Sequence, residues 1–311
     1  MTVLVLTCEE DVTADMVVSA LDGDGVPVVR LDPADLPGEV SLSAEYVQGD
    51  FHGHLAGAGR LVTMSGLRSI WIRRPGEPGT NAVEQSAWLT TESTHALYGA
   101  LNCTTARWMN HPGAAAQARQ KPWQLHVAHH SGFAVPPTLI TTFPQVAREF
   151  AERHRDLVVK SVSGAHPGNP PMTLPTTRIA PDADFAGVAA GPTLLQQRVP
   201  KCADIRLTCV GQAMFAARKA SDPDPEQVDG RFAGDGRGWE PTGVPSRIEK
   251  AVRAYMESAR LAYGAFDFAE DAEGTWWFLE CNQGGQFGFI ELETEQPIAR
   301  AVASWLATGA T

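Results

Sequence analysis

The hydrophobic positions near the N-terminus follow the periods of a strand, a helix and a second strand. "TVLVLTC" (residues 2–8) is a short apolar run, an acidic segment of helical character follows it, and "VPVVRLDP" (26–33) is a second apolar run. This order predicts a strand, a helix and a parallel strand, the beginning of an α/β lobe. A further strand is expected in "SIWIRRPGEPG" (69–79). It ends in Arg73 and Arg74, which suit either an anion site or, more simply, solvated charges at a strand end.

The middle of the chain alternates helical and strand patterns. "NHPGAAAQARQKPWQLHVAHHSG" (110–132) predicts a helix closed by Gly132, and "VPPTLITT" (135–142) predicts the strand that follows. A second helix, "PQVAREFAERHR", leads to the apolar strand "DLVVKSVSG", which carries Lys160. Two Gly/Pro-rich segments, "SGAHPGNPP" (163–171) and "DPDPEQVDGRFAGDGRG" (222–238), are expected to be loops. The pattern is that of an α+β protein with long loops.

A helix before the last hairpin has marked ends. Ser246 and Glu249 have the spacing of a capping box, and Gly264 suits the helix end. Apolar residues at helical spacing predict its buried face, namely Ile248, Val252, Tyr255, Ala259 and Ala262. A final helix is expected from about Pro297 to Ala307.

The segment "GAFDFAEDAEGTWWFLECNQGGQ" (264–286) reads as a hairpin that is apolar on both faces and yet carries Asp267, Glu280 and Asn282. Residues two apart on a strand share a face, so alternation places Trp276, Phe278, Glu280 and Asn282 on one side. If the turn holds an even number of residues, Asp267 lies opposite or diagonal to Glu280. Two carboxylates and an amide oxygen fit Mg²⁺. The same spacing equally fits two carboxylates hydrogen-bonded at a strand end.

Composition narrows the class of protein. The chain has 311 residues, 43% of them hydrophobic, and a net charge of −11, which argues against non-specific nucleic-acid binding. It shows neither a signal peptide nor an apolar run long enough to span a membrane. Five scattered cysteines without a C-x-x-C spacing argue against a complete disulfide framework, so we expect a cytoplasmic protein.

Three features together resemble the ATP-grasp ligases, in particular their RimK-like branch: the hairpin, the segment "LLQQRVPKCADIRLTCVG" (194–211) and the lysines upstream. The resemblance covers roughly residues 110–307. It implies an α+β ATP-grasp fold with an N-terminal α/β lobe. The implied domains are a pre-ATP-grasp domain (1–110), a central subdomain (111–192) and a C-terminal subdomain (193–311).

The resemblance also assigns site residues for ATP and Mg²⁺. The family pattern of an Asp on one strand and a Glu-x-Asn on the next implies Asp267, Glu280 and Asn282 as metal ligands. The implied ATP contacts are Lys121 and Lys160 to phosphates and adenine, Gln196, Gln197 and the backbone near Val199 to adenine, and Asp204 to ribose. Family members usually have Glu where this chain has Gln197, so an amide oxygen would accept the adenine hydrogen bond. Arg206 and the loop arginine Arg231, preceded here by Gly230 instead of an aromatic residue, would serve the phosphate and acyl chemistry.

Within this group, "IWIRRP", the segment from Trp108 to Thr142 and the C-terminal stretch resemble the graspetide, or microviridin-type, macrocyclases. The implied partner is a ribosomal precursor peptide with a leader and a core that carries acidic residues and hydroxyl or Lys side chains. The implied activity is ATP-dependent ester or amide crosslinking within that peptide, without nucleic acid or membrane, and a homodimer is possible. Two alternatives stay open: a RimK-like carboxylate–amine ligase that adds an amino acid to a peptide, protein or small molecule, and a non-catalytic ATP-grasp-like binding protein.

Overall fold

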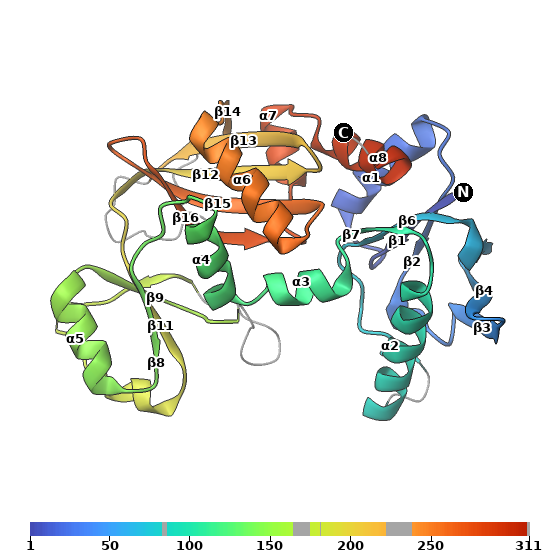
Figure 1. Ribbon diagram of the computed structural model, residues 1–311, viewed down its shortest axis with the longest axis horizontal. Coiled ribbons are helices and arrows are strands. Elements are labelled where there is room, and N and C mark those ends of the chain that lie inside the picture. Colours follow the sequence, from blue (N-terminus) through green and yellow to red (C-terminus); the bar gives the residue numbers. More distant parts are fainter. Residues whose placement is uncertain (83–85, 164–174, 181, 222–237, 310–311) are drawn as a thin grey trace.

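The computed structural model describes residues 1–82, 86–163, 175–180, 182–221 and 238–309. Its elements form an N-terminal lobe, a small central sheet and a larger C-terminal sheet (Figure 1). The expected α+β architecture with an N-terminal α/β lobe is confirmed. No helix in these ranges is both long and apolar enough to cross a membrane.

The N-terminal lobe is built on a parallel sheet with the strand order β2-β1-β6-β7. Its strands are β1 (Thr2–Leu6), β2 (Val28–Leu31), β6 (Leu67–Ile72) and β7 (Arg107–Met109). The helices α1 (Val12–Gly23) and α2 (Ala87–Asn102) complete it. The Asp11 carboxylate accepts a hydrogen bond from the Ala14 amide and so caps α1. The predicted strand, helix and parallel strand are therefore correct.

A three-stranded antiparallel sheet extends this lobe. It contains β3 (Ser41–Val47), β4 (Asp50–Gly57) and β5 (Arg60–Thr63). Short 3-10 helices η1 (Pro33–Asp35) and η2 (Met64–Gly66) connect it to the parallel sheet.

The expected helix over residues 110–132 is two helices, α3 (Pro112–Ala118) and α4 (Lys121–His130). Pro122 stands in the first turn of α4. Its ring would clash with the carbonyl four residues earlier in a continuous helix, so the chain breaks before it. Gly132 follows α4 with a φ of 98°, as the prediction of a glycine stop requires.

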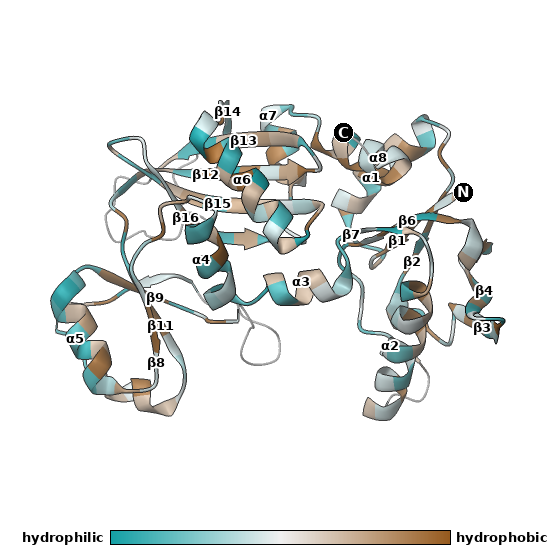
Figure 2. Ribbon diagram, in the orientation of Figure 1, coloured by the Kyte–Doolittle hydropathy of each residue, from teal (hydrophilic) through white to brown (hydrophobic). Residues whose placement is uncertain are grey.

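The central sheet has the order β10-β9-β11-β8 and is antiparallel throughout. Its strands are β8 (Thr138–Thr141), β9 (Leu157–Lys160), β10 (Thr177–Arg178) and β11 (Thr193–Gln197), with α5 (Pro144–His154) and the 3-10 helix η3 (Ala186–Ala190) beside them. Ala147, Phe150, Leu157 and Leu195 belong to its small core. Figure 2 shows brown and teal residues along α5, as expected for a helix with one buried face.

The C-terminal sheet is antiparallel with the order β14-β13-β12-β15-β16. Its strands are β12 (Lys201–Val210), β13 (Ala213–Ala220), β14 (Glu240–Thr242), β15 (Tyr263–Asp271) and β16 (Trp276–Asn282). The helix α6 (Ser246–Ala259) covers one face, and Tyr255, Phe266, Phe268 and Phe278 pack there in the core (Figure 1). The predicted apolar face of α6 is buried from Ile248 to Ala259, whereas Ala262 lies beyond the helix.

The predicted ends of α6 are wrong. Pro245 is the N-cap residue, and its side chain has no group that could accept a hydrogen bond from the helix. Glu249 forms an ion pair with Arg253 at 2.8 Å. At the other end, Arg260 adopts a left-handed conformation with a φ of 52°, and Gly264 lies inside β15. A Cβ at Gly264 would lie 3.0 Å from the sulfur atoms of both Cys281 and Met256. This glycine therefore lets the helix approach the sheet.

The last helices return the chain to its beginning. After α7 (Gly288–Thr294), helix α8 (Ile298–Thr308) packs beside α1, where the red and blue ends of the chain meet in Figure 1. Val17, Ile298, Val302 and Leu306 share one core. The final helix is predicted correctly, but the core it joins also contains β1 and α1.

Candidate active site

A cleft of about 950 Å³ opens between the central sheet, α4 and the exposed face of the C-terminal sheet. The residues at 73 and 74, after β6, also line it. Eight of the eleven predicted site residues line the cleft: Lys121, Lys160, Gln196, Asp204, Arg206, Asp267, Glu280 and Asn282. Gln197 and Val199 are outside its lining, and Arg231 lies outside the described residues.

Asp267 and Glu280 stand opposite each other in the β15–β16 ladder, as expected, although residues 271–275, between the paired Glu270 and Trp276, are not the even number that the expectation assumed. The assumption of strict alternation along β16 is wrong, however. Phe268 pairs with Phe278 and Asp267 with Glu280, so Leu279 is an extra residue at a β-bulge. Trp276, Phe278 and Cys281 therefore enter the core, whereas Leu279, Glu280 and Asn282 line the cleft. The bulge explains how an apolar hairpin presents polar groups on one side.

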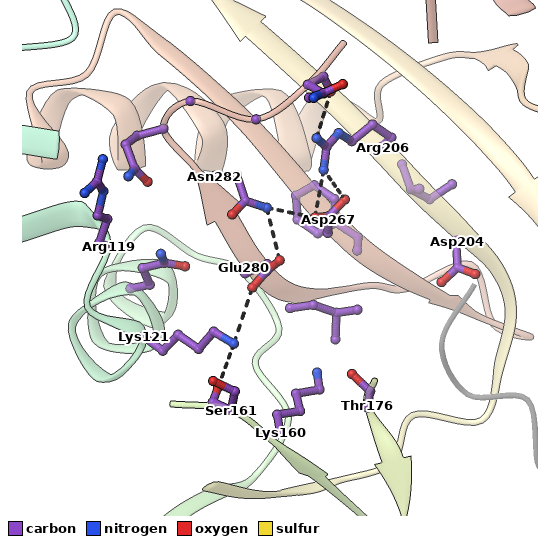
Figure 3. A pocket seen from close by; sticks show the side chains of 18 of the residues that line it. Arg119, Lys121, Lys160, Ser161, Thr176, Asp204, Arg206, Asp267, Glu280 and Asn282 are labelled. Carbon is purple, nitrogen blue, oxygen red and sulfur yellow. Dashed lines mark hydrogen bonds and ion pairs between the residues drawn. The ribbon is translucent and has the colours of Figure 1, made fainter. Parts of the chain in front are cut away.

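A hydrogen-bonded network joins the polar groups on this face (Figure 3). One guanidinium nitrogen of Arg206 donates to both Asp267 oxygens, at 2.7 and 2.8 Å. The Asn282 amide donates to Asp267 at 3.2 Å and to Glu280 at 3.0 Å. The Lys121 ammonium lies 3.7 Å from Glu280 and donates to the Ser161 carbonyl at 2.8 Å. Each carboxylate thus has a cation and an amide beside it.

The two carboxylates respond differently to this environment. Burial raises the pKa of Asp267 and the negative charge of Glu280 adds to the effect, although Arg206 opposes it. Burial also opposes ionisation of Glu280, but the charge of Lys121 and the hydrogen bond from Asn282 outweigh it and lower the pKa of that carboxyl. Glu280 is consequently the more readily ionised member of the pair.

The donor set suits a hard divalent cation. Asp267 and Glu280 offer carboxylate oxygens on one face, and both side chains keep about a third of their surface exposed, at 30% and 33%. Asn282 adds a carboxamide whose oxygen becomes available if the amide turns over. Oxygen donors of this kind fit Mg²⁺.

At the other end of the cleft, polar side chains of the central sheet face the same space. The Lys160 ammonium donates to the Gln196 carboxamide oxygen at 2.8 Å, and the Gln196 amide donates to the Thr138 hydroxyl at 2.9 Å. Across the cleft, Lys201 donates to both oxygens of Asp204, at 2.6 and 2.8 Å. The positive charge of Lys160 also helps to lower the pKa of Glu280, so this lysine of the central sheet lies near the carboxylate pair.

The comparisons with known proteins agree with this geometry. Residues 2–115 match the family described as the MvdD pre-ATP grasp domain. The whole chain is similar to the Chryseobacterium gregarium RiPP-associated ATP-grasp ligase, with a TM-score of 0.90, 25% identity, and coverage of 100% of this chain and 97% of that one. That ligase was solved in complex with ADP and a leader and core peptide.

Two macrocyclases from Microcystis aeruginosa MRC are also similar. For MdnC, bound with the precursor peptide MdnA, the TM-score is 0.86, the identity is 26%, and 98% of this chain and 99% of that chain are covered. For MdnB the values are 0.82, 27%, 99% and 99%. The chain is an ATP-grasp ligase. A search of curated proteins returns no match.

Four side chains of the ligase donate hydrogen bonds to backbone carbonyls after Asn282, and the sequence did not predict that they would act on the same segment. The carbonyls of Gln283 and Gly285 accept hydrogen bonds from Asn110 at 3.0 Å and from the Tyr263 hydroxyl at 2.7 Å. Arg73 donates to the Gly284 carbonyl, and Arg206 donates to the Gln286 carbonyl at 2.9 Å. The four residues that follow the predicted metal ligand are thereby fixed.

For Arg73, both interpretations from the sequence, an anion site and a solvated charge at a strand end, are wrong. Its side chain is 1% exposed and lies 3.5 Å from the Asp11 carboxylate, which is 2% exposed. Arg73 is thus a buried link between α1 and the Gly284 carbonyl. Neither interpretation anticipated this role, because both partners are distant in the sequence: Asp11 lies before α1, and Gly284 lies 211 residues after Arg73.

Gln124 is a second residue that the sequence reasoning missed. Its carboxamide accepts a hydrogen bond from the Cys281 amide at 2.9 Å and donates to the Cys281 carbonyl at 3.1 Å. It is 4% exposed and donates also to the Ala118 carbonyl, at 2.6 Å. The signal in the sequence was a glutamine at helical spacing from Val127 and Ala128, which places its polar side chain on the same face as these apolar residues.

Proposed function

We propose that this ligase activates an Asp or Glu side chain of a ribosomal precursor peptide as an acyl phosphate and then closes an ester or amide crosslink within the same peptide. The observation that carries the proposal is the full-length similarity to ligases bound to leader, core or precursor peptides, in a chain whose cleft brings Asp267 and Glu280 together with Lys121 and Lys160. The proposed domains are residues 1–110, 111–192 and 193–311, and five free cysteines are compatible with a cytoplasmic protein.

In this proposal, Asp267, Glu280 and Asn282 hold Mg²⁺ through oxygen donors that share the cleft face. The ion would neutralise charge on the phosphate oxygens of the bound nucleotide. The hydrogen bonds now seen from Asn282 and the ion pairs from Arg206 and Lys121 hold the two carboxylates at the same place. These contacts limit the repulsion between the carboxylates before the site is filled.

The remaining cleft residues are proposed to bind ATP. Lys121 and Lys160 suit phosphate oxygens, since each is a compact cation beside the carboxylate pair. Gln196, with Gln197 and the backbone near Val199, would contact adenine, and Asp204 would contact ribose. Two solved structures of the ligase PsnB contain Mg and ADP, and they share the fold of this chain at 18% and 20% identity.

The proposed reaction has two steps. An oxygen of the substrate carboxylate attacks the γ-phosphorus of ATP, the bond to the β-phosphate oxygen breaks, and ADP leaves. A hydroxyl or amine of the same peptide then attacks the acyl carbon and expels phosphate, which takes up the proton that the nucleophile loses. Arg206, and Arg231 by its family position, would offset the charge on the transferred group. The second step gains from a nucleophile that is already held close to the acyl carbon.

The two alternative functions remain distinguishable. D-cycloserine synthetase DcsG matches with a TM-score of 0.58 and 16% identity, so the same fold also occurs in a synthetase of a different kind. A carboxylate–amine ligase that adds an amino acid is therefore the main rival. A non-catalytic binding protein is less well supported, because all three predicted metal ligands are present in the cleft.

The experiment is mass spectrometry of candidate precursor peptides after incubation with the ligase, ATP and Mg²⁺. Ring closure removes one water for each crosslink, whereas the rival ligase adds the mass of an amino acid less water. Hydroxylamine should trap the acyl phosphate as a hydroxamate, with ADP as the nucleotide product. A peptide that changes only when a free amino acid is supplied, or AMP as product, would contradict the proposal.

A further inference from the structure

The cleft carries more positive charge than its acidic groups balance. Among the described residues, eight Lys and Arg side chains and three carboxylates line it, in a chain with a net charge of −11. A nucleotide triphosphate with bound Mg²⁺ would offset only part of this excess. A second anionic group is therefore electrostatically favoured in the cleft.

Most of the cations are already paired. Lys121 lies beside Glu280, Lys201 beside Asp204, Arg206 beside Asp267, and Arg73 beside Asp11. Lys160 donates to Gln196. By contrast, neither Arg74 nor Arg119 has a hydrogen bond or ion pair from its guanidinium to any residue in the described part of the chain, and both are exposed.

Both arginines are tied to the end of β16 at which Asn282 lies. Gly284, two residues after Asn282, is so close to the backbone before Arg74 that a Cβ at this glycine would lie 3.9 Å from the Arg73 carbonyl. Arg119 follows Ala118, whose carbonyl accepts from the Gln124 amide that also binds the Cys281 carbonyl. In Figure 3, Arg119 lies beyond Asn282, on the side away from Asp204 and Thr176.

The charges in this region interact. Burial lowers the pKa of Arg73 most, Asp11 and Tyr263 raise it, and the positive charges of Arg74 and Arg206 lower it further. Arg74 and Arg206 are consequently both close enough to Arg73 for their charges to repel it. An anion bound between these guanidinium groups would relieve that repulsion.

We propose that Arg74 and Arg119 form a carboxylate-binding subsite for an acidic side chain of the substrate peptide, at the end of the cleft opposite Lys160 and Asp204. This inference rests on the proposed function and adds the residues that select its acidic substrate. A guanidinium group binds a carboxylate with two parallel hydrogen bonds, which orients it as well as neutralising it. Such binding would also reduce the repulsion as the carboxylate approaches the nucleotide phosphates.

The test uses a small probe, N-acetyl-L-glutamate N-methylamide, whose side chain mimics a peptide glutamate. Its binding to the full-length ligase, saturated with Mg²⁺ and a non-hydrolysable ATP analogue, is measured by saturation-transfer NMR. Arg74→Gln and Arg119→Gln should each weaken binding about tenfold or more, as expected when a charge-assisted hydrogen bond is lost. Arg153→Gln, which removes an exposed arginine from α5 outside the cleft, should bind the probe like the wild type.

The outcomes separate this subsite from the proposed function. Stabilisation by the nucleotide analogue should be equal in all four proteins, and its absence from the wild type would contradict the proposed function itself. If the nucleotide binds and all four proteins hold the probe equally, the subsite is wrong. It is also wrong if the neutral probe N-acetyl-L-glutamine N-methylamide binds as well, or if the wild type fails to bind the acidic probe at about 50 mM.

Discussion

The two faces of the β15–β16 hairpin have opposite characters although they share the same backbone. On the core side, Phe266 and Phe278 are fully buried and pack against Tyr255 and Phe133. On the cleft side, Asp267 and Glu280 keep about a third of their surface exposed and are held by cations and an amide. The bulge at Leu279 separates these roles. Stability and chemistry can therefore be changed independently on this hairpin.

The largest expected effect comes from the core face. Phe278→Ala should lower the free energy of unfolding by about 3–5 kcal/mol, because it leaves a cavity among aromatic rings that are 5.5 and 5.7 Å away, centre to centre. Chemical denaturation measures the change. Phe143→Ala, at a side chain that is 67% exposed, should change stability by less than about 0.5 kcal/mol. Equal losses in the two variants would contradict the division between the faces.

The next effect should be on activity alone. Glu280→Gln is nearly isosteric and removes the charge beside Lys121, so turnover should fall by about 10²–10³-fold while thermal unfolding stays close to that of the wild type. Glu273→Gln, in the exposed turn of the same hairpin, is the matched control and should keep full turnover. If a well-folded Glu280→Gln ligase kept wild-type turnover, the Glu280 carboxylate would not be needed for the reaction.

A smaller effect is expected where the two faces are coupled. Gln124→Leu leaves the amide and carbonyl of Cys281 without their side-chain partner, which should cost about 1–3 kcal/mol of unfolding free energy. Hydrogen exchange at the Cys281 amide should also become faster. Gln117→Leu, at an exposed position on α3, should do neither. If hydrogen exchange at the Cys281 amide were unchanged in Gln124→Leu, the hydrogen bonds between Gln124 and Cys281 would not stabilise the packing of α4 on β16.

The smallest effect is a difference in thiol labelling. Burial raises the pKa of Cys209 to about 12 and that of Cys281 above the usual thiol value, so at pH 8 neither should form appreciable thiolate. Cys103 and Cys202 are exposed. A disulfide reagent followed by mass spectrometry should modify the exposed pair in the native ligase and reach Cys209 and Cys281 only on unfolding. Early labelling of Cys281 would show that the core face of β16 is open.

The hairpin also shows how far the sequence leads. The sequence placed Asp267 near Glu280, but strand alternation and turn length do not explain their pairing. An odd number of residues, 271–275, separates the paired Glu270 and Trp276, so strict cross-strand pairing would put Asp267 opposite Leu279. Alternation failed at Leu279, because a bulge inserts a residue without any signal in the apolar pattern. For the same reason, the sequence placed Trp276 and Phe278 on the wrong side of the strand.

Longer-range contacts were harder to predict. The capping box at Ser246 failed for a local reason, because the helix has Pro245 as its N-cap residue and Glu249 pairs with Arg253 four residues later in the same helix. Arg73 and Gln124 bind backbone atoms more than 150 residues away in the sequence, at Gly284 and Cys281. No local period encodes such pairs. Their partners became visible only when the N-terminal lobe, α4 and β16 were assembled.

The central claim is that the cleft face of the hairpin holds a divalent cation together with the nucleotide. Mn²⁺ prefers the same oxygen donors as Mg²⁺, and its electron paramagnetic resonance signal distinguishes free from bound ion. With a non-hydrolysable ATP analogue, a Mn²⁺ titration of the wild-type ligase should show the free-ion signal decreasing beyond the level for nucleotide alone. Asp267→Asn and Glu280→Gln should lose this extra binding, whereas Glu273→Gln should keep it. Equal Mn²⁺ binding by the wild type and the Glu280→Gln variant would contradict the account.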